Sequence, residues 1–171
     1  RGEMVFWVVK GGPDACGKGC SEWVAAEGFF DPKASERLRI FLNFEARRKL
    51  PIFFHSIGGG GYAGFLVGLV LRDFRMNVSV GRTVVAPCTA VTLAADSCRN
   101  LTNNNELKAR LVAGFCNSAC VFALIGGSGR KIPDNAYVGV HTGSPRGFSA
   151  SPTIEDFTRD AKRYTLEFGI D

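Results

Sequence analysis

The sequence predicts an α/β domain with a largely parallel sheet, and two observations support this fold class. Apolar, β-branched stretches of strand length alternate with longer stretches whose apolar residues recur at helical spacing. Such alternation is typical of sheets whose parallel strands are joined by helices through right-handed crossovers. The chain has 171 residues, of which 46% are hydrophobic, so residues 1–171 suit a single domain with a sizeable core.

The chain opens with two stretches of strand-forming residues. Met4 to Val9 is apolar and rich in valine, and Glu22 to Phe30 is centred on a Trp-Val-Ala-Ala run. A glycine-rich loop from Cys16 to Cys20 separates these two expected strands. The dipeptide Asp31-Pro32 then suits the N-cap and first position of a helix, which ends in a basic run that complements the helix dipole.

A second strand–helix–strand unit follows. Leu50 to His55 predicts a short buried strand, and the four glycines from Gly58 to Gly61 allow the backbone to approach another group closely. The stretch from Tyr62 to Val70 has apolar residues at the i, i+3, i+4, i+7 and i+8 positions of a helix. Val78 to Val85 predicts the next strand.

In the second half of the chain, a segment expected to lie outside the core precedes a strand that leads to a serine. Residues 87–110 carry two cysteines and a polar, asparagine-rich run, which indicates a segment outside the core layers. Leu111 to Phe115 predicts a strand that leads to Ser118 at the start of a small-residue helix. Gly126 to Asn135 is expected to be a turn region.

The last elements are a strand and a helix. Ala136 to Val140 predicts a strand that ends at His141. The run Thr153-Ile154-Glu155-Asp156 resembles a capping box, and apolar residues at helical spacing follow it.

The distribution of charged and apolar residues indicates which kinds of partner the protein is expected to bind. The 21 basic and 16 acidic residues give a net charge of +5, but the basic residues are scattered rather than clustered, which favours a solvated face over a nucleic-acid interface. No apolar run reaches the roughly eighteen residues that a membrane helix needs. We therefore expect no nucleic-acid partner and no membrane span. No signal peptide is recognisable at Arg1, so the location has to be inferred from the cysteines.

Six cysteines fall into three close pairs. The spacing within pairs does not match zinc motifs and the chain has only two histidines, so we expect no metal. A disulfide framework is favoured instead, which implies an oxidising compartment such as a periplasm, while buried free thiols are the alternative. The connectivity stays open, with a preference for pairing between neighbours: Cys16 with Cys20, Cys88 with Cys98, and Cys116 with Cys120.

Ser118 has two interpretations. Serine is a favoured N-cap residue, and for a lone serine at a helix start this is the commoner role. The alternative is a nucleophile, because His141 and the Gly58 to Gly61 loop also follow expected strands, and such loops meet at one edge of a parallel sheet. Histidine supplies the base that a serine needs, and the glycine loop and the amide of Ala119 supply N–H donors for an oxyanion.

Several short motifs, taken in their order, resemble the ClpP serine peptidase family from about Trp23 to Phe168. That family has a Ser-Pro-Gly-Gly loop, a nucleophile turn, a Pro-Asn-Ala-like turn and a strand that ends in histidine. The closest resemblance is to bacterial periplasmic proteins of this superfamily, which carry a Cys-x-Ser-Ala-Cys element and a cysteine loop before a Glu-Trp strand. The matching segments are Ser56-Ile57-Gly58-Gly59, Cys116-Asn117-Ser118-Ala119-Cys120, Pro133-Asp134-Asn135-Ala136, Val138-Gly139-Val140-His141, and Cys16 to Cys20 followed by Glu22-Trp23.

The resemblance implies a ClpP/crotonase-like fold of repeated ββα units, with a mostly parallel sheet flanked by helices. It implies that Ser118 is the nucleophile and His141 the general base, with the amides of Gly58 or Gly59 and of Ala119 as the oxyanion hole. It further implies a peptide or protein substrate, no cofactor and a tendency to form homo-oligomers. The ClpP acid follows the last helix, so we expect it beyond Asp171, or else a Ser-His dyad; Asp156 and Asp160 lie on that helix.

Two alternatives to a periplasmic serine peptidase are kept. A catalytically silent module would use the same fold to bind a peptide or a protein partner. Crotonase-like acyl-thioester chemistry would use the same oxyanion hole, but an oxidising compartment lacks the usual acyl-coenzyme A pool.

Overall fold

A mostly parallel five-stranded sheet forms the centre of the computed structural model, which describes residues 2–85, 109–141, 162–164 and 166. The strand order is β1-β2-β3-β4-β8. β1 pairs with β2 in antiparallel fashion, and the other three pairs are parallel. The strands are β1 (Val5–Lys10), β2 (Glu22–Glu27), β3 (Ile52–His55), β4 (Asn77–Val80) and β8 (Gly129–Lys131). The predicted α/β class with a largely parallel sheet is confirmed.

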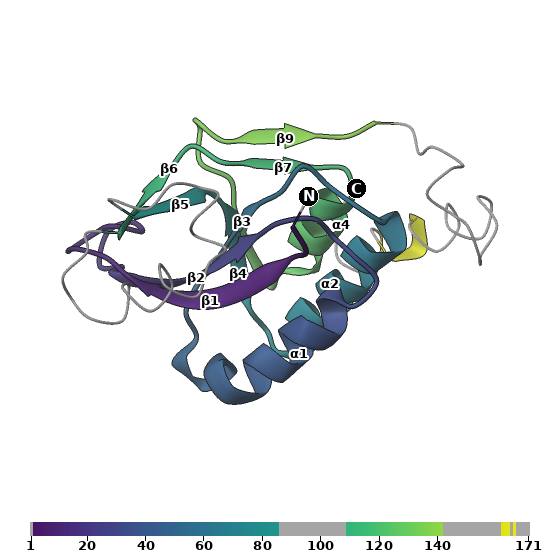
Figure 1. Ribbon diagram of the computed structural model, residues 1–171, viewed down its shortest axis with the longest axis horizontal. Coiled ribbons are helices and arrows are strands. Elements are labelled where there is room, and N and C mark those ends of the chain that lie inside the picture. The colour runs from purple at the N-terminus through teal and green to yellow at the C-terminus, as the bar shows by residue number, and fades with distance from the viewer. Residues whose placement is uncertain (1, 86–108, 142–161, 165, 167–171) are drawn as a thin grey trace.

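In the described segments, three helices cover one face of this sheet: α1 (Ala34–Glu45), α2 (Gly61–Asp73) and α4 (Ala119–Gly126) (Figure 1). Alternate strand residues such as Val24 and Phe54 point to this face and pack with buried residues of the helices. α2 and α4 approach closely through glycines. A Cβ on Gly64 would lie 2.0 Å from the carbonyl oxygen of Ala119, and one on Gly68 would lie 2.7 Å from that of Phe122.

Two small ribbons complete the described fold. β5 (Arg82–Val85) and β6 (Ala109–Val112) pair in antiparallel fashion, and Val85 and Ala109 contribute to a second buried cluster with Trp23 and Phe53 on the other face of the sheet. β7 (Phe115–Asn117) and β9 (Tyr137–Gly139) pair in parallel, and a bridge between Ser56 and Cys116 connects β7 to the end of β3.

Two predicted strands are each divided by a glycine. The stretch from Val78 to Val85 forms parts of β4 and β5, which are separated by Gly81, and the stretch from Leu111 to Phe115 is divided at Gly114. A Cβ on Gly114 would lie 2.6 Å from the Cα of Gly81, so the two backbones cross where only glycine fits. The expectation of two continuous strands was wrong because both segments leave one sheet for another at this crossing.

Two further expectations need correction. The expected turn region from Gly126 to Asn135 contains β8, whose short, polar Gly-Arg-Lys sequence carries no apolar strand pattern. α1 begins at Ala34, not at Asp31; Asp31 Oδ1 accepts the Lys33 amide at 3.0 Å and so closes a turn before the helix. Of the expected last helix, residues 162–164 and 166 are helical, while its expected start lies outside the described residues.

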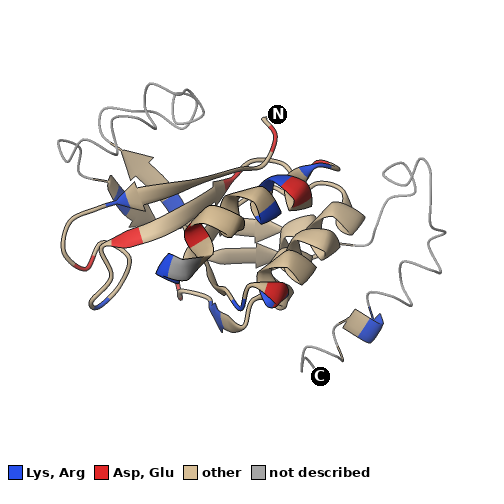
Figure 2. Ribbon diagram, turned by 90° about the horizontal axis from the view of Figure 1, so that it is seen from below, with Lys and Arg blue, Asp and Glu red and all other residues tan. Residues whose placement is uncertain are grey.

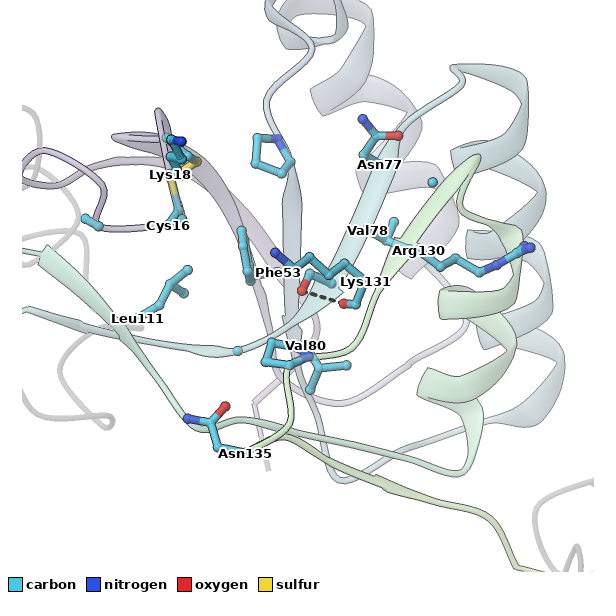
Figure 3. A pocket seen from close by; sticks show the side chains of 18 of the residues that line it. Cys16, Lys18, Phe53, Asn77, Val78, Val80, Leu111, Arg130, Lys131 and Asn135 are labelled. Atoms are coloured by element: carbon cyan, nitrogen blue, oxygen red, sulfur yellow. Dashed lines mark hydrogen bonds between the residues drawn. A yellow bond between two sulfur atoms is a disulfide. The ribbon is translucent and has the colours of Figure 1, made fainter.

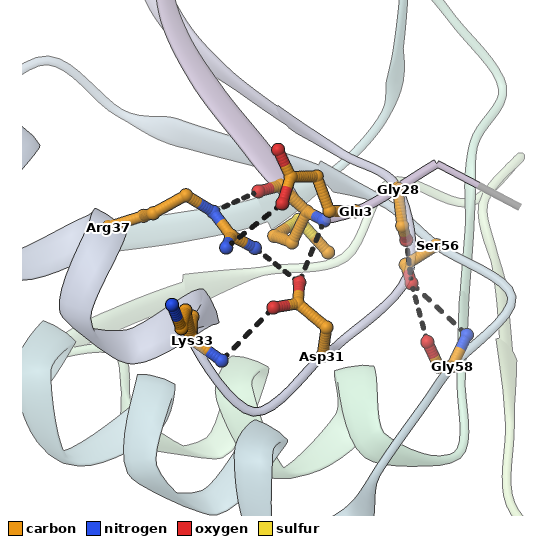
Figure 4. A network of polar contacts seen from close by, with 8 residues as sticks. Glu3, Gly28, Asp31, Lys33, Arg37, Ser56 and Gly58 are labelled. Atoms are coloured by element: carbon orange, nitrogen blue, oxygen red, sulfur yellow. Dashed lines mark hydrogen bonds and ion pairs between the residues drawn. The ribbon is translucent and has the colours of Figure 1, made fainter.

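Arg37 ties the start of β1 to the start of α1 (Figure 4). Its Nε donates to the carbonyl oxygen of Met4 at 3.0 Å, and its guanidinium forms ion pairs with Glu3 and Asp31. Partial burial acts to raise the pKa of Asp31, but the hydrogen bonds from Arg37 and from the Lys33 amide, with the Arg37 charge, hold that pKa below its ordinary value. This network fixes Asp31, which directly follows Phe30, against the start of β1.

Candidate active site

Ser118 occupies a strained turn between β7 and α4. Its backbone has φ 54° and ψ −117°, a region that residues other than glycine rarely adopt. The turn is held by its backbone, since the Ser118 amide donates to the carbonyl oxygen of Gly139 at 2.8 Å and its carbonyl oxygen accepts from Val121 at 2.9 Å. Ser118 is the N-cap residue of α4, but its side chain makes no capping hydrogen bond. A strained strand-to-helix turn that presents a serine is the geometry of the nucleophilic serine in α/β-hydrolases.

The glycine loop after β3 lies directly against this serine. A Cβ on Gly58 would lie 2.9 Å from the Cβ of Ser118, so a side chain at this position would occupy the space beside the serine. Gly58 and Gly59 have φ values of +113° and +151°, which favour glycine. Phe30 holds the loop from the other side: its amide donates to the Gly58 carbonyl oxygen at 3.0 Å, and its carbonyl oxygen accepts from the Gly60 amide at 2.8 Å.

These contacts distinguish between the two predicted loop donors. The Gly58 amide donates to Ser56 Oγ at 3.1 Å and therefore already has a partner. The Gly58 carbonyl points at Phe30, so in a trans peptide the following Gly59 N–H points away from Phe30. Within the described ranges, no acceptor takes the amide of Gly59, or that of Ala119 in the first turn of α4. Of the three predicted donors, Gly59 and Ala119 therefore have amides without an acceptor in the described ranges, and Gly58 does not.

His141 lies on the same sheet edge as Ser118. β9 runs parallel to β7 with Gly139 opposite Asn117, and the chain continues to His141 two residues further on. An extended chain advances roughly 3.3 Å per residue, so the His141 backbone lies within roughly 7 Å of Gly139, the residue that holds the Ser118 amide. The His141 side chain is exposed.

The other histidine, His55, is packed as a structural residue. Its Nδ1 accepts the Phe115 amide at 3.3 Å, and its ring centre lies 3.9 Å from that of the Phe115 side chain. Burial, with the charge of Arg82, lowers the pKa of His55 from 6.5 to about 4. His55 is therefore neutral at pH 7 and uses one ring nitrogen to hold β7.

Two of the favoured disulfides are present. Cys16 is bonded to Cys20, and Cys116 to Cys120, so neighbour pairing is confirmed for these four residues. Cys88 and Cys98 lie outside the described residues. The Cys116–Cys120 bridge is fully buried and spans the turn that carries Ser118. Both bridges are compatible with an extracytoplasmic location.

A cavity of about 720 Å³ lies away from this site (Figure 3). Its lining includes Pro51, Asn77 and Gly129 at the starts of parallel strands and Val80 and Gly81 at the end of β4, but neither Ser118 nor the glycine loop. Lys18 and Lys131 also line this cavity, together with apolar residues such as Phe53 and Leu111. This pocket is separate from the chemistry that the sequence predicts.

Further features of the described segments bear on partners. No group of histidine, cysteine or acidic side chains in them is arranged to hold a metal ion, and none of their helices is both long enough and apolar enough to cross a membrane. Basic and acidic residues are interspersed over helices and loops (Figure 2). The acids considered for a triad, Asp156, Asp160 and Asp171, lie outside the described residues.

Ser56 lies beside the candidate site, and the sequence predicts nothing for it beyond its place in the Ser56-Ile57-Gly58-Gly59 motif. Its hydroxyl is buried and joins three segments around the glycine loop. The available indication was its position, since a serine two residues before a glycine loop can hydrogen-bond a backbone amide of that loop.

The sequence was compared with models of known families and with curated proteins, and neither comparison finds a match.

Proposed function

We propose that this protein is an extracytoplasmic serine peptidase with a ClpP-like fold of repeated ββα units, in which Ser118 is the nucleophile and His141 the general base. The observation that carries the proposal is the strained turn at Ser118, whose side chain does not cap the helix that follows it. Backbone strain at a residue other than glycine persists only where the surrounding structure imposes it, and it is concentrated at functional sites.

The proposed reaction follows from the groups around this turn. His141 accepts the proton of the Ser118 hydroxyl as Oγ attacks the carbonyl carbon of a peptide bond. The amides of Gly59 and Ala119 donate to the oxyanion that develops. His141 then gives the proton to the leaving amine, and water attacks the resulting ester to release the acid and restore the serine. In enzymes with an oxyanion hole, removing one side-chain donor lowers the rate by an amount equivalent to about 3–4 kcal/mol of transition-state stabilisation.

Three further observations support the proposal. Gly59 holds an amide directed away from Phe30 without an acceptor in the described part of the chain. β7 and β9 pair in parallel, and Ser118 and His141 each follow the carboxyl end of one of these strands. The Cys16–Cys20 and Cys116–Cys120 disulfides suit an oxidising compartment. A serine nucleophile works in such a compartment because it does not depend on a reduced thiol. Assembly into a homo-oligomer is part of the proposal through the ClpP resemblance.

Peptide cleavage by the purified full chain tests this function. The protein and its Ser118→Ala variant are incubated with a tryptic digest of unfolded casein, and new peptide termini are identified by mass spectrometry. We expect new cleavage products with the unmodified chain and none with Ser118→Ala. Equal product patterns would overturn the proposal. Peptides retained by both chains without cleavage would instead support a silent binding module.

A further inference from the structure

Ser56 is a buried hydroxyl at the junction of three segments. It lies between the last residue of β3 and the glycine loop, and its residue is 2% exposed. Its side chain contacts Gly28, which follows β2, and Gly58 of the loop (Figure 4). A polar group this buried must have its hydrogen bonds satisfied within the protein.

The hydrogen bonds of this hydroxyl can be assigned. A serine has one O–H donor and lone pairs that accept. The carbonyl oxygen of Gly28 lies 2.6 Å from Oγ and that of Gly58 lies 3.3 Å away, so the hydrogen goes to Gly28. A lone pair then accepts the Gly58 amide at 3.1 Å. The hydroxyl therefore links the end of β2 to the peptide plane that begins the glycine turn.

The backbone of Ser56 extends the link to the nucleophile strand. The Ser56 amide donates to the Phe115 carbonyl oxygen at 2.8 Å, and the Ser56 carbonyl oxygen accepts from the Asn117 amide at 3.0 Å. Asn117 directly precedes Ser118. A single residue thus holds the loop of Gly58 and Gly59 in register with the strand that leads to Ser118.

We propose that Ser56 is a positioning residue for the Ser118 site: its hydroxyl holds the Gly58 amide, so that the Gly59 amide is the one left to face the oxyanion. This inference rests on the proposed function of Ser118. Without the hydroxyl, the Gly58 N–H and the Gly28 carbonyl lose their shared partner, so the Ile57–Gly58 peptide can turn and displace the adjoining Gly58–Gly59 peptide, which, among the described residues, Phe30 alone then holds. A displaced donor costs rate because oxyanion donors stabilise the transition state only in one geometry.

Ser79 offers a matched control for Ser56. It is also buried, at 4% exposure, and its Oγ donates to a backbone carbonyl, that of Lys131, at 2.6 Å. Its partner belongs to β8, and Ser79 lies on β4, with no contact to the glycine loop or to β7 among the hydrogen bonds of the described residues. Replacing either serine by alanine removes a similar buried hydrogen bond, but only one of them borders the candidate site.

The experiment compares Ser56→Ala, Ser56→Cys and Ser79→Ala with the unmodified full chain. The rate of covalent labelling by a biotinylated fluorophosphonate is measured over a range of probe concentrations, which separates probe binding from the bond-forming step. Thermal unfolding and hydrogen exchange of the Gly58 amide are followed on the same samples. Ser56→Cys keeps the volume of the side chain with a weaker acceptor and covers the case in which Ser56→Ala does not fold.

We expect the bond-forming rate to fall about tenfold to a hundredfold in Ser56→Ala and less in Ser56→Cys, with faster exchange at Gly58 and little change in probe binding. Ser79→Ala should lose a similar amount of thermal stability and keep the labelling rate. Labelling of Ser56→Ala at the unmodified rate, or an equal loss in Ser79→Ala, would overturn the positioning role and leave the proposed function standing. An unmodified chain that folds but does not label at Ser118 would overturn both.

Discussion

At the scale of single residues, the site depends on backbone conformations that few residue types adopt. Ser118 has φ 54°, and Gly59 has φ +151° while two Phe30 backbone groups hold its neighbours. Both positions were predicted from the sequence, because the residue types alone show a run of glycines between a strand and a helix, and a serine at the end of a strand. The sequence could not separate Gly58 from Gly59 as donors, because that choice depends on the Ser56 hydroxyl and on the direction of one peptide plane.

The Gly59→Ala variant tests this backbone requirement. A Cβ at this position would lie 2.4 Å from the Phe30 carbonyl oxygen, and its φ is unfavourable for alanine. We expect a loss of about 2 kcal/mol or more in the free energy of unfolding, together with loss of labelling by a fluorophosphonate. Urea unfolding of Gly12→Ala serves as the control, since nothing lies within 4 Å of a Cβ there, and its stability should change by less than about 0.5 kcal/mol. Equal stability of the two variants would show that the loop is not constrained as described.

At the scale of secondary-structure elements, alternation of strands and helices was enough to predict the sheet and the helices that cover it. The exchange of strands between sheets was not predictable, because Gly81 and Gly114 are far apart in the sequence and reveal their contact only in space. β8 was missed since Arg130 and Lys131 give no apolar pattern, although they extend the main sheet. The Cys116–Cys120 disulfide joins β7 to the first turn of α4 and so encloses Ser118.

The two short disulfides allow an internal comparison. Cys16–Cys20 and Cys116–Cys120 have the same sequence separation of 4, but only the second spans Ser118. We expect each double alanine variant to lose about 2 kcal/mol of stability through the larger entropy of the unfolded chain, with a further loss for the buried 116/120 pair.

Labelling separates the two bridges. Only the Cys116→Ala/Cys120→Ala chain should react more slowly with a fluorophosphonate, since only its nucleophile turn loses a constraint. Urea unfolding and labelling rates measure both effects. Similar rates for both variants would mean that the bridge does not hold the turn in its reactive form.

At the scale of the whole molecule, two partly buried ionisable groups have opposite effects on stability as pH changes. Glu27 Oε1 accepts the Thr83 amide at 2.8 Å, and burial raises the pKa of Glu27 from 4.5 to about 7, against the lowering effects of that hydrogen bond and of Arg82. Its contribution is present below pH 4.5 and is lost as pH rises to about 7. For His55, whose pKa is lowered to about 4, stability is instead lost as pH falls from 6.5 to about 4.

Glu27→Gln isolates one of these effects. Glutamine keeps an oxygen acceptor for the Thr83 amide but carries no charge. A pKa raised from 4.5 to about 7 corresponds to about 3 kcal/mol, so relative to the unmodified chain the variant should gain up to about this amount between pH 4.5 and pH 8. Urea unfolding at both pH values measures the difference. A constant difference between the two chains would contradict a raised pKa for Glu27.

The central claim is that Ser118 is a nucleophile activated by His141. The most direct measurement is covalent labelling of the folded full chain by a fluorophosphonate, with the modified residue identified by peptide mass spectrometry. We expect one adduct, on Ser118, in the unmodified chain and in His55→Asn, no adduct in Ser118→Ala, and a rate at least about a hundredfold lower in His141→Ala. A folded, unmodified chain without an adduct on Ser118, or an unchanged rate in His141→Ala, would contradict the claim.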